Sequence, residues 1–340
     1  DFSNTYEIIP IIENLLQELK KEIFIKGYTL RVSASLGISI YPDDATEIKS
    51  LMKYADMAMY KTKAEGRDNY NFFTQTHNAK IHTEVEMVND MQRAFYDNEF
   101  KLYYQAKVDV KTQKIIGAEA LIRWDHHKKG LISPIHFIPL AENTGFILNI
   151  GKLVITESTQ AIKRFNDLGF NDLTISINVS TRQFQNSNLY GDLQEAIQES
   201  KINPKQLAIE ITESIMMRHI DSALIMLKKL KELGVSIYLD DFGTGYSSLS
   251  YLKKFPINTL KIDKSFVDDI QDDEKKNDSL LVNTILAMGK SLGIKVIAEG
   301  VENKTQFEFL KSRDCDTIQG YYFSKPIPEK EFIALLAKGV

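Results

Sequence analysis

The chain has 340 residues, of which 43% are hydrophobic and 26% are charged, the composition of a globular protein rather than a disordered or fibrous one. This length exceeds one ordinary core and predicts one large domain with a smaller piece beside it. The formal net charge of -4 argues against general nucleic-acid binding, which needs a basic face.

Cys315 is the only cysteine, which excludes an intramolecular disulfide and a thiolate metal cluster and fits a reducing compartment. We interpret it as a small core residue rather than a nucleophile, because the sequence indicates no Cys-His arrangement. No apolar run approaches the ~20 residues of a membrane span, so we expect no membrane contact from these residues. The start at Asp1 suggests a piece of a longer protein. We expect it to be cytoplasmic, alone or as the cytoplasmic part of a membrane-anchored protein.

The first 74 residues predict a small α+β segment without a catalytic cluster. Apolar side chains recur at helical spacing over residues 6–25 and 46–64. Strands are expected over Leu30–Tyr41 and in the short apolar stretch that ends at Phe73. Residues 75–98 look like a linker and a helix, whose apolar stripe is either core or a contact between domains or subunits.

From residue 100 onwards, short strands alternate with helical stretches, a pattern typical of βα units around a parallel sheet. The expected strands are Phe100–Val110, Ile115–Arg123, Leu173–Ser180, Leu207–Glu213, Ser236–Asp241, Thr259–Asp263, Lys295–Val301 and Thr317–Phe323. The expected helices are 136–148, 151–168, 189–200, 219–233, 245–254, 278–292 and 303–312. About 240 residues of this kind favour a TIM-like (β/α)8 barrel of the α/β class. Only residues 111–114 separate the first two strands, so we expect that pair to be antiparallel.

Polar residues lie within or at the ends of nearly all of these otherwise apolar strands, at the same relative height. They are Glu119, Asn178, Glu210, Glu213, Asp240, Asp241, Lys261, Asp263, Glu299, Glu302 and Gln319. Isolated buried charges are costly, so stability alone explains such a set poorly. A barrel carries its chemistry at the C-terminal mouth, where the strand ends converge. We therefore predict metal binding or catalysis at this mouth.

Asp240 and Asp241 are adjacent at the end of one strand, and a loop with two glycines follows them. Neighbouring side chains of a strand point to opposite faces, so the pair serves either two sites or one site around the strand tip. Crowded carboxylates raise each other's pKa unless a cation compensates them. The stretch suggests a site for divalent metal and phosphate, and a turn in which one aspartate caps the next helix is the alternative.

Oxygen ligands without histidine or cysteine favour Mg2+ or Mn2+ over Zn2+, and we expect none of the six histidines on a barrel strand. The carboxylates suffice for two ions, which can activate a water and stabilise an in-line displacement at phosphorus. Lys261 either orients or helps to deprotonate that water, or is a plain counter-ion. Arg123 either grips a phosphate in bidentate fashion or makes a surface ion pair.

Several short motifs follow one another in a fixed order. They are Tyr103–Gln105, Glu119–Trp124, Gly130–Pro134, Asn178–Ser180, Glu210–Ser214, Asp240–Leu249, Lys261–Asp263, Ala298–Glu302 and Gln319–Tyr321. This ordered set resembles EAL domains, the cyclic-di-GMP phosphodiesterases, over roughly residues 85–340. Residues 1–74 resemble the C-terminal half of a GGDEF (diguanylate cyclase) domain through the motifs Ser35–Ile38, Ala55–Lys61 and Gly66–Asn69. The signature Gly-Gly-Asp-Glu-Phe loop is absent, so we expect no cyclic dinucleotide synthesis, with residues 75–84 as a linker.

The resemblance implies that the barrel hydrolyses one phosphodiester of cyclic di-GMP to linear pGpG with two metal ions. The positions implied for the first ion are Glu119, Asn178, Glu210 and Asp240. Those implied for the second ion, with one ligand shared, are Asp240, Asp241 and Glu299. The catalytic positions are those of Lys261, which assists the attacking water, and of Glu302, an essential supporting glutamate, beside the ligands Glu119, Asp240 and Asp241.

The resemblance also implies a binding surface for the dinucleotide. Positions near it are Gln105, Leu121, Arg123, Asp263 and Gln319, the last supporting the substrate and water network. Glu213 matches a glutamate that holds the loop after Asp241 next to the usual dimer contact, so we expect a homodimer through the barrel. Departures from the pattern at Ala106, His127 and Asp314 remove no metal ligand. The alternatives are a receptor that binds cyclic di-GMP without turnover and a hydrolase for another phosphodiester.

Overall fold

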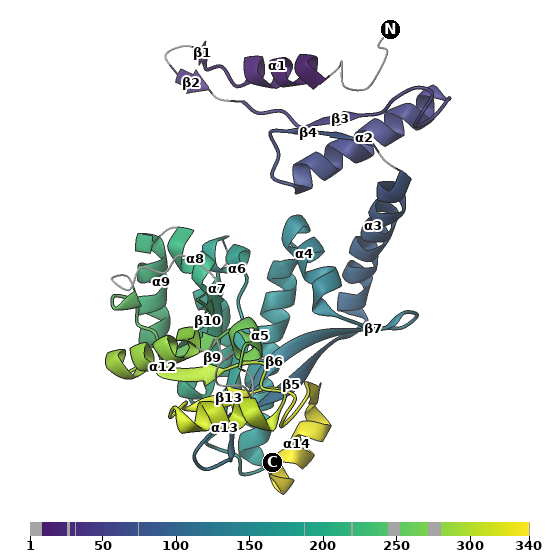
Figure 1. The fold of residues 1–340 in the computed structure, drawn as a ribbon. Helices are drawn as coiled ribbons and strands as arrows, with labels where there is room; N and C mark the ends of the chain where they lie inside the picture. The colour runs from purple at the N-terminus through teal and green to yellow at the C-terminus, as the bar shows by residue number, and fades with distance from the viewer. Residues whose placement is uncertain are drawn as a thin grey trace. The chain divides into compact units, whose positions relative to one another are not determined.

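A computed structural model describes residues 9–25, 28–30, 32–73, 75–186, 188–218, 220–243, 252–270 and 280–339. The chain divides into two compact units, Asp1–Arg93 and Ala94–Val340. Figure 1 traces the chain from its purple N-terminal end to its yellow C-terminal end. Among the described residues, no helix combines the length and the apolar character needed to cross a bilayer.

The first unit is a small α+β assembly. Its elements are α1 (Ile9–Leu19), β1 (Ile23–Ile25), β2 (Tyr28–Leu30), β3 (Leu36–Ile38), α2 (Ile48–Ala64) and β4 (Tyr70–Phe72). The rings of Tyr54 and Phe73 stack with their centroids 4.0 Å apart. Together with Met57 and Ala58 they form the small core of this unit. The helix expected over 6–25 ends at Leu19 because β-branched residues suit the strand that follows. The proposed linker, 75–84, is the first part of α3 (Gln75–Tyr96).

Eight strands close a barrel in the second unit. They are β5 (Phe100–Asp109), β6 (Ile115–His126), β8 (Thr174–Asn178), β9 (Leu207–Thr212), β10 (Ser236–Phe242), β11 (Thr259–Ile262), β12 (Lys295–Ala298) and β13 (Thr317–Gln319). The order is β5-β13-β12-β11-β10-β9-β8-β6, and pairing of β6 with β5 closes it. Strand β5 is antiparallel to both neighbours, and the other pairs are parallel. The predicted barrel with one antiparallel strand is therefore confirmed.

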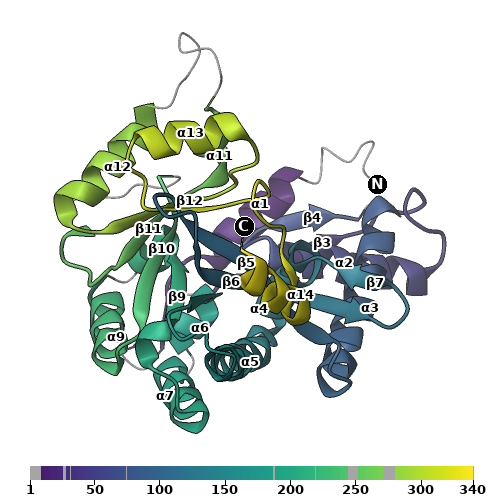
Figure 2. The same cartoon turned by 90° about the horizontal axis from the view of Figure 1, so that it is seen from below.

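Helices surround these strands, and in Figure 2 α7, α9 and α12 lie outside the barrel. The longer ones are α4 (Pro134–Thr144), α5 (Ile147–Asp167), α7 (Leu189–Ser200), α9 (Ile220–Leu233), α12 (Leu280–Leu292), α13 (Lys304–Ser312) and α14 (Glu329–Lys338). The sequence did not predict α14, nor the short elements α6 (Thr181–Asn186), α8 (Glu213–Arg218), α11 (Lys264–Asp268), β7 (Gly130–Ile132) and β14 (Ile327–Pro328). The expected helix at 136–148 ends early because Gly145 caps it with a φ of 84°. Most of the expected helix 245–254 lies outside the described residues.

Successive side chains along each strand point to opposite faces, so apolar side chains face outward to the helices and polar side chains face into the barrel. Tyr104 of β5 packs against Phe165 of α5 and Phe332 of α14, with ring centroids 5.7 Å apart. Burial of Tyr104 on this side turns its neighbour Gln105 inward. Cys315 is fully buried, and burial raises the pKa of its thiol to about 12, which confirms a core role.

Candidate metal centre at the barrel mouth

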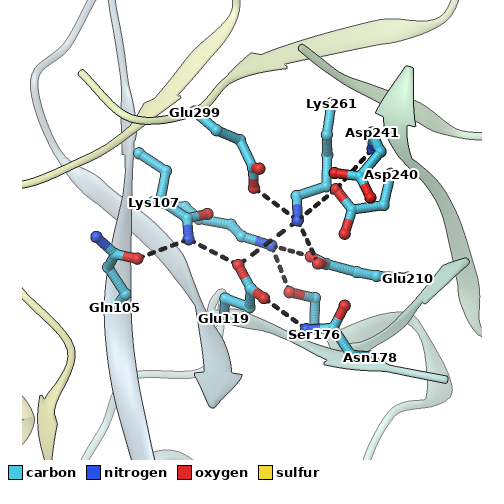
Figure 3. A network of polar contacts seen from close by, with 11 residues as sticks. Gln105, Lys107, Glu119, Ser176, Asn178, Glu210, Asp240, Asp241, Lys261 and Glu299 are labelled. Atoms are coloured by element: carbon cyan, nitrogen blue, oxygen red, sulfur yellow. Dashed lines mark hydrogen bonds and ion pairs between the residues drawn. The ribbon is translucent and has the colours of Figure 1, made fainter. Parts of the chain in front are cut away.

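The strand ends bring most of the predicted polar residues into one cluster, shown in Figure 3. Parallel pairing places Asn178 of β8 beside Glu210 of β9. Each further strand adds a polar side chain at the same end of the barrel. Together these residues are Gln105, Glu119, Asn178, Glu210, Asp240, Asp241, Lys261, Glu299 and Gln319. Convergence of parallel strand ends thus creates the cluster, as the sequence predicts.

Lys261 lies in the middle of the cluster, and its side chain is only 1% exposed. Its Nζ lies 2.6 Å from Glu299 Oε1, 3.0 Å from Asp240 Oδ1 and 3.5 Å from Glu119 Oε2. It also donates a hydrogen bond to Glu210 Oε2. Burial disfavours the ammonium, but these carboxylates outweigh burial and raise the Lys261 pKa well above its usual value. A cationic group therefore fits the space between these acidic residues.

Lys107 of β5 is a second buried cation in the cluster, and sequence reasoning missed it. Its Nζ lies 2.7 Å from Glu210 Oε1 and also donates to Ser176 Oγ. Burial alone would raise the Glu210 pKa, but the ammonium groups of Lys107 and Lys261 lower it to about 2. Lys107 lies two residues after Gln105, on the same face of the strand, and this spacing was the signal that could have identified Lys107.

The cluster holds more carboxylates than ammonium groups. Burial raises the Glu299 pKa to about 8, and neighbouring carboxylates add to this although Lys261 opposes it. Burial also raises the pKa values of Asp240 and Asp241, with further repulsion from nearby acidic groups. Divalent cations would relieve this repulsion, and the oxygen donors suit Mg2+ or Mn2+.

The end of β10 explains how two adjacent aspartates reach one cluster. The pairing of β10 with β11 shifts register between Leu239 and Phe242. Asp241 adopts a left-handed backbone with a φ of 52°, and its N–H donates to Asp240 Oδ1 at 3.0 Å. This irregularity breaks the alternation of a regular strand, so both carboxylates lie at the mouth, as Figure 3 shows. The two carboxylates therefore lie together around the strand tip rather than on opposite faces of the strand.

Amide side chains hold the other side of the cluster. Glu119 accepts hydrogen bonds from Asn178 Nδ2 at 2.6 Å and from Gln319 Nε2 at 2.7 Å. Gln319 Nε2 also donates to Gln105 Oε1 at 3.0 Å. Gln319 Oε1 is buried and has no hydrogen-bond partner among the described residues. A buried acceptor of this kind fits a bound water or ligand.

The remaining predicted residues lie around the cluster rather than inside it. Glu302 forms an exposed ion pair with Lys264 at 2.9 Å. Asp263 caps α11 by accepting a hydrogen bond from the Ser265 N–H. Glu213 begins α8 and is buried, and the loop that it is predicted to hold, after Gly243, lies outside the described residues.

Arg123 and Leu121 lie on β6, beyond Glu119. The guanidinium of Arg123 donates to the Ile122 carbonyl at 2.9 Å, and its burial lowers the Arg123 pKa. Leu121 lines a cavity of about 400 Å3 that also contacts Asn178. Apolar side chains of α4 and α5, among them Ile138, form its wall. A hollow for an apolar or aromatic group therefore adjoins the acidic cluster.

The prediction that no histidine lies on a barrel strand is wrong, because pairing with β7 extends β6 as far as His126. Glu99, His126 and His127 place possible ligand atoms within 4.8 Å of one another. The two imidazole rings stack with their centroids 4.7 Å apart and their planes 8° apart. Glu99 accepts hydrogen bonds from Trp124 Nε1 and contacts His127 Nδ1. Stacked rings direct their lone pairs along parallel planes, so this arrangement suits a hydrogen-bond network better than one shared ion.

Comparison with known proteins supports the sequence resemblance. Residues 88–326 match the family model for the EAL domain, and residues 2–69 match the model for the diguanylate cyclase, GGDEF domain. The bifunctional diguanylate cyclase/cyclic di-GMP phosphodiesterase MucR of Pseudomonas aeruginosa is 38% identical over 96% of this chain and 47% of its own length. Cyclic di-GMP phosphodiesterase NbdA of the same organism is 34% identical over 96% of this chain and 42% of its own length.

A solved structure gives the same relationship in three dimensions. The PaMucR phosphodiesterase in complex with c-di-GMP is 39% identical, with a TM-score of 0.70 over 73% of this chain and 99% of that one. The chain spans less than half the length of the two curated relatives above. Its motifs and barrel together show that the chain belongs to the EAL domain family, with a short GGDEF segment before the barrel.

Proposed function

We propose that this chain hydrolyses cyclic di-GMP to linear 5'-pGpG in a metal-dependent reaction and so lowers the level of this second messenger. The observation that carries the proposal is the excess of buried carboxylates around Lys261 at the mouth of an EAL barrel. Relatives named as cyclic di-GMP phosphodiesterases support the choice of substrate.

The oxygen donors at the mouth suit two Mg2+ or Mn2+ ions. The residues that would hold the first ion are Glu119, Asn178, Glu210 and Asp240. The residues that would hold the second ion are Asp240, Asp241 and Glu299. When bound, the ions would activate a water and neutralise charge on the phosphodiester.

The chain's own residues would orient the reactants. A protonated lysine only donates hydrogen bonds, so Lys261 would hold the attacking water through one of its lone pairs. Arg123 would bind a phosphate oxygen at the mouth, since guanidinium matches phosphate geometry. The cavity beside Leu121 would take one guanine base, with Gln105 and Asp263 close to the dinucleotide. Gln319 would support water through its Oε1, which has no hydrogen-bond partner among the described residues, with Glu302 in a supporting role.

The direct test is incubation of the purified chain with cyclic di-GMP and Mg2+ or Mn2+, with chromatography of the products and EDTA as the metal-free control. We expect pGpG to form only with metal. Glu119→Gln should abolish this reaction, whereas Glu99→Gln, a matched change of a buried glutamate outside the cluster, should retain it. Recovery of intact but tightly bound cyclic di-GMP would instead support the receptor alternative.

Three further proposals concern the organisation of the protein. We place a GGDEF-like segment at residues 1–74, a linker at 75–84 and the phosphodiesterase barrel at 85–340. We propose a homodimer through the barrel, in which Glu213 supports the loop beside the contact, and a cytoplasmic location. Light scattering of the purified chain measures its mass in solution, and a monomer at every concentration would contradict the dimer.

A further inference from the structure

The two oxygens of the Glu210 carboxylate bind two different lysines. Lys107 Nζ lies 2.7 Å from Oε1, whereas Lys261 Nζ contacts Oε2. The carboxylate itself is fully buried. Lys107 and Lys261 come from β5 and β11, and Figure 3 shows both ammonium groups next to the Glu210 carboxylate. Each oxygen of this carboxylate therefore has a partner of its own.

Lys107 is fixed in place by groups on either side of β9. Ser176 of β8 accepts a second hydrogen bond from its ammonium, and the ring centroid of Tyr238 on β10 lies 4.9 Å away. The Lys107 side chain is 4% exposed, so an ammonium that left these partners would lose them without gaining water. The contact with Glu210 Oε1 is therefore a rigid part of the barrel interior.

The two lysines differ in what a metal ion would do to them. Lys261 touches four carboxylates, and all of these belong to the proposed metal ligands. An ion that binds between them competes directly with its ammonium. Lys107, by contrast, forms its described ion pair with Glu210 alone and lies on the oxygen away from Lys261. A bound ion can thus replace Lys261 at Glu210 Oε2 while Lys107 keeps Oε1.

We propose that Lys107 is a positioning residue that occupies Oε1 of Glu210, so that this carboxylate offers a metal ion only one oxygen. The restriction to one oxygen selects Mg2+ over Ca2+. Ca2+ takes 6–8 oxygen ligands and readily accepts both oxygens of a carboxylate, whereas Mg2+ requires a compact octahedron of single oxygens. Blocking one oxygen therefore penalises the larger ion. This proposal rests on the proposed function, because it takes Glu210 as a metal ligand.

The test is isothermal titration calorimetry with MgCl2 and with CaCl2 on the wild-type chain, Lys107→Met and Ser176→Ala. Methionine has a similar length without charge, so it leaves Oε1 available to the ion. We expect Lys107→Met to raise the ratio of Ca2+ affinity to Mg2+ affinity by about tenfold, the effect of roughly one charge-assisted contact. Ser176→Ala removes the other partner of the same ammonium and keeps its contact with Glu210, so the ratio should stay near the wild-type value.

An unchanged affinity ratio in a folded Lys107→Met chain, checked by circular dichroism, would overturn the proposal. Lys107→Ile, which carries a β-branched side chain suited to a strand, provides a second neutral variant with the same expected shift. A wild-type chain that binds metal and hydrolyses cyclic di-GMP, together with unchanged ratios in both variants, would refute only the role of Lys107. A wild-type chain that binds neither ion would refute the proposed function as well.

Discussion

Replacement of Lys261 by methionine should destabilise the chain in EDTA and make its stability strongly dependent on Mg2+. The ammonium lies 2.6, 3.0 and 3.5 Å from three carboxylates and also contacts Glu210. Breaking a buried ion pair by removing one partner costs about 3–5 kcal/mol, because the remaining charges stay buried without compensation. We expect a loss of this order in the free energy of unfolding in EDTA.

Added Mg2+ should restore much of this loss. An ion at about 100 times its dissociation constant stabilises the folded state by about 2.7 kcal/mol. Because Lys261 no longer competes with the ion, the variant should gain more from Mg2+ than the wild-type chain does. Urea denaturation with and without Mg2+ measures both effects.

The matched control is Lys152→Met, which removes an exposed lysine that contacts Asp192 and Glu195. Exposed ion pairs contribute little, so its unfolding should differ little from that of the wild-type chain. If Lys261→Met in EDTA unfolds at the same urea concentration as Lys152→Met, the reasoning about the central ammonium is refuted. The kcat of Lys261→Met should fall by about a hundredfold or more while KM changes little, and the opposite pattern would assign Lys261 to substrate binding.

Three other predictions concern charge, substrate and core. In EDTA, the Glu299 pKa of about 8 lies above its usual value of 4.5, so its contribution to stability is fully present below pH 4.5 and lost as pH rises through about 8. Glu299→Gln should therefore make the free energy of unfolding, measured by denaturation at a series of pH values, less dependent on pH across this range. A pH dependence as steep as that of the wild type would contradict this. Arg123→Lys should raise KM by about tenfold through loss of bidentate phosphate contact, and steady-state kinetics with an unchanged KM would exclude that contact. Phe332→Ala should cost about 3–5 kcal/mol of unfolding free energy, because this fully buried ring packs on Tyr104 and Phe165. A loss under about 1 kcal/mol in urea denaturation would show instead that the neighbouring side chains close the cavity left by the ring.

The central lysine gives the acidic cluster a way to fold before any metal binds. Glu119, Glu210, Asp240 and Glu299 all contact one ammonium, which offsets part of their repulsion. The same contacts place Lys261 among the residues proposed to hold the ions and the attacking water. Folding and catalysis thus draw on one side chain, which explains why the predicted effects of Lys261→Met on stability and on kcat should appear together.

The sequence alone determined the barrel and most of its site. Strand and helix periodicities recur locally, so all eight barrel strands were predictable, and the short connection 111–114 required an antiparallel first pair. Each polar residue near a strand end could be assigned to the mouth, because parallel strand ends must converge. For the same reason Lys107 could have been noticed, but its role depends on Glu210, which is distant in the chain.

Other features arise from contacts between distant segments, so they could be seen only in the folded barrel. The register shift between β10 and β11 brings Asp240 and Asp241 to one site, whereas regular alternation along a strand predicts opposite faces. Pairing with β7 carries β6 as far as His126, because a strand ends where its partner ends rather than where its own pattern stops. The separate lysine partners of the two Glu210 oxygens likewise require the closed barrel, since β5, β9 and β11 meet only in its interior.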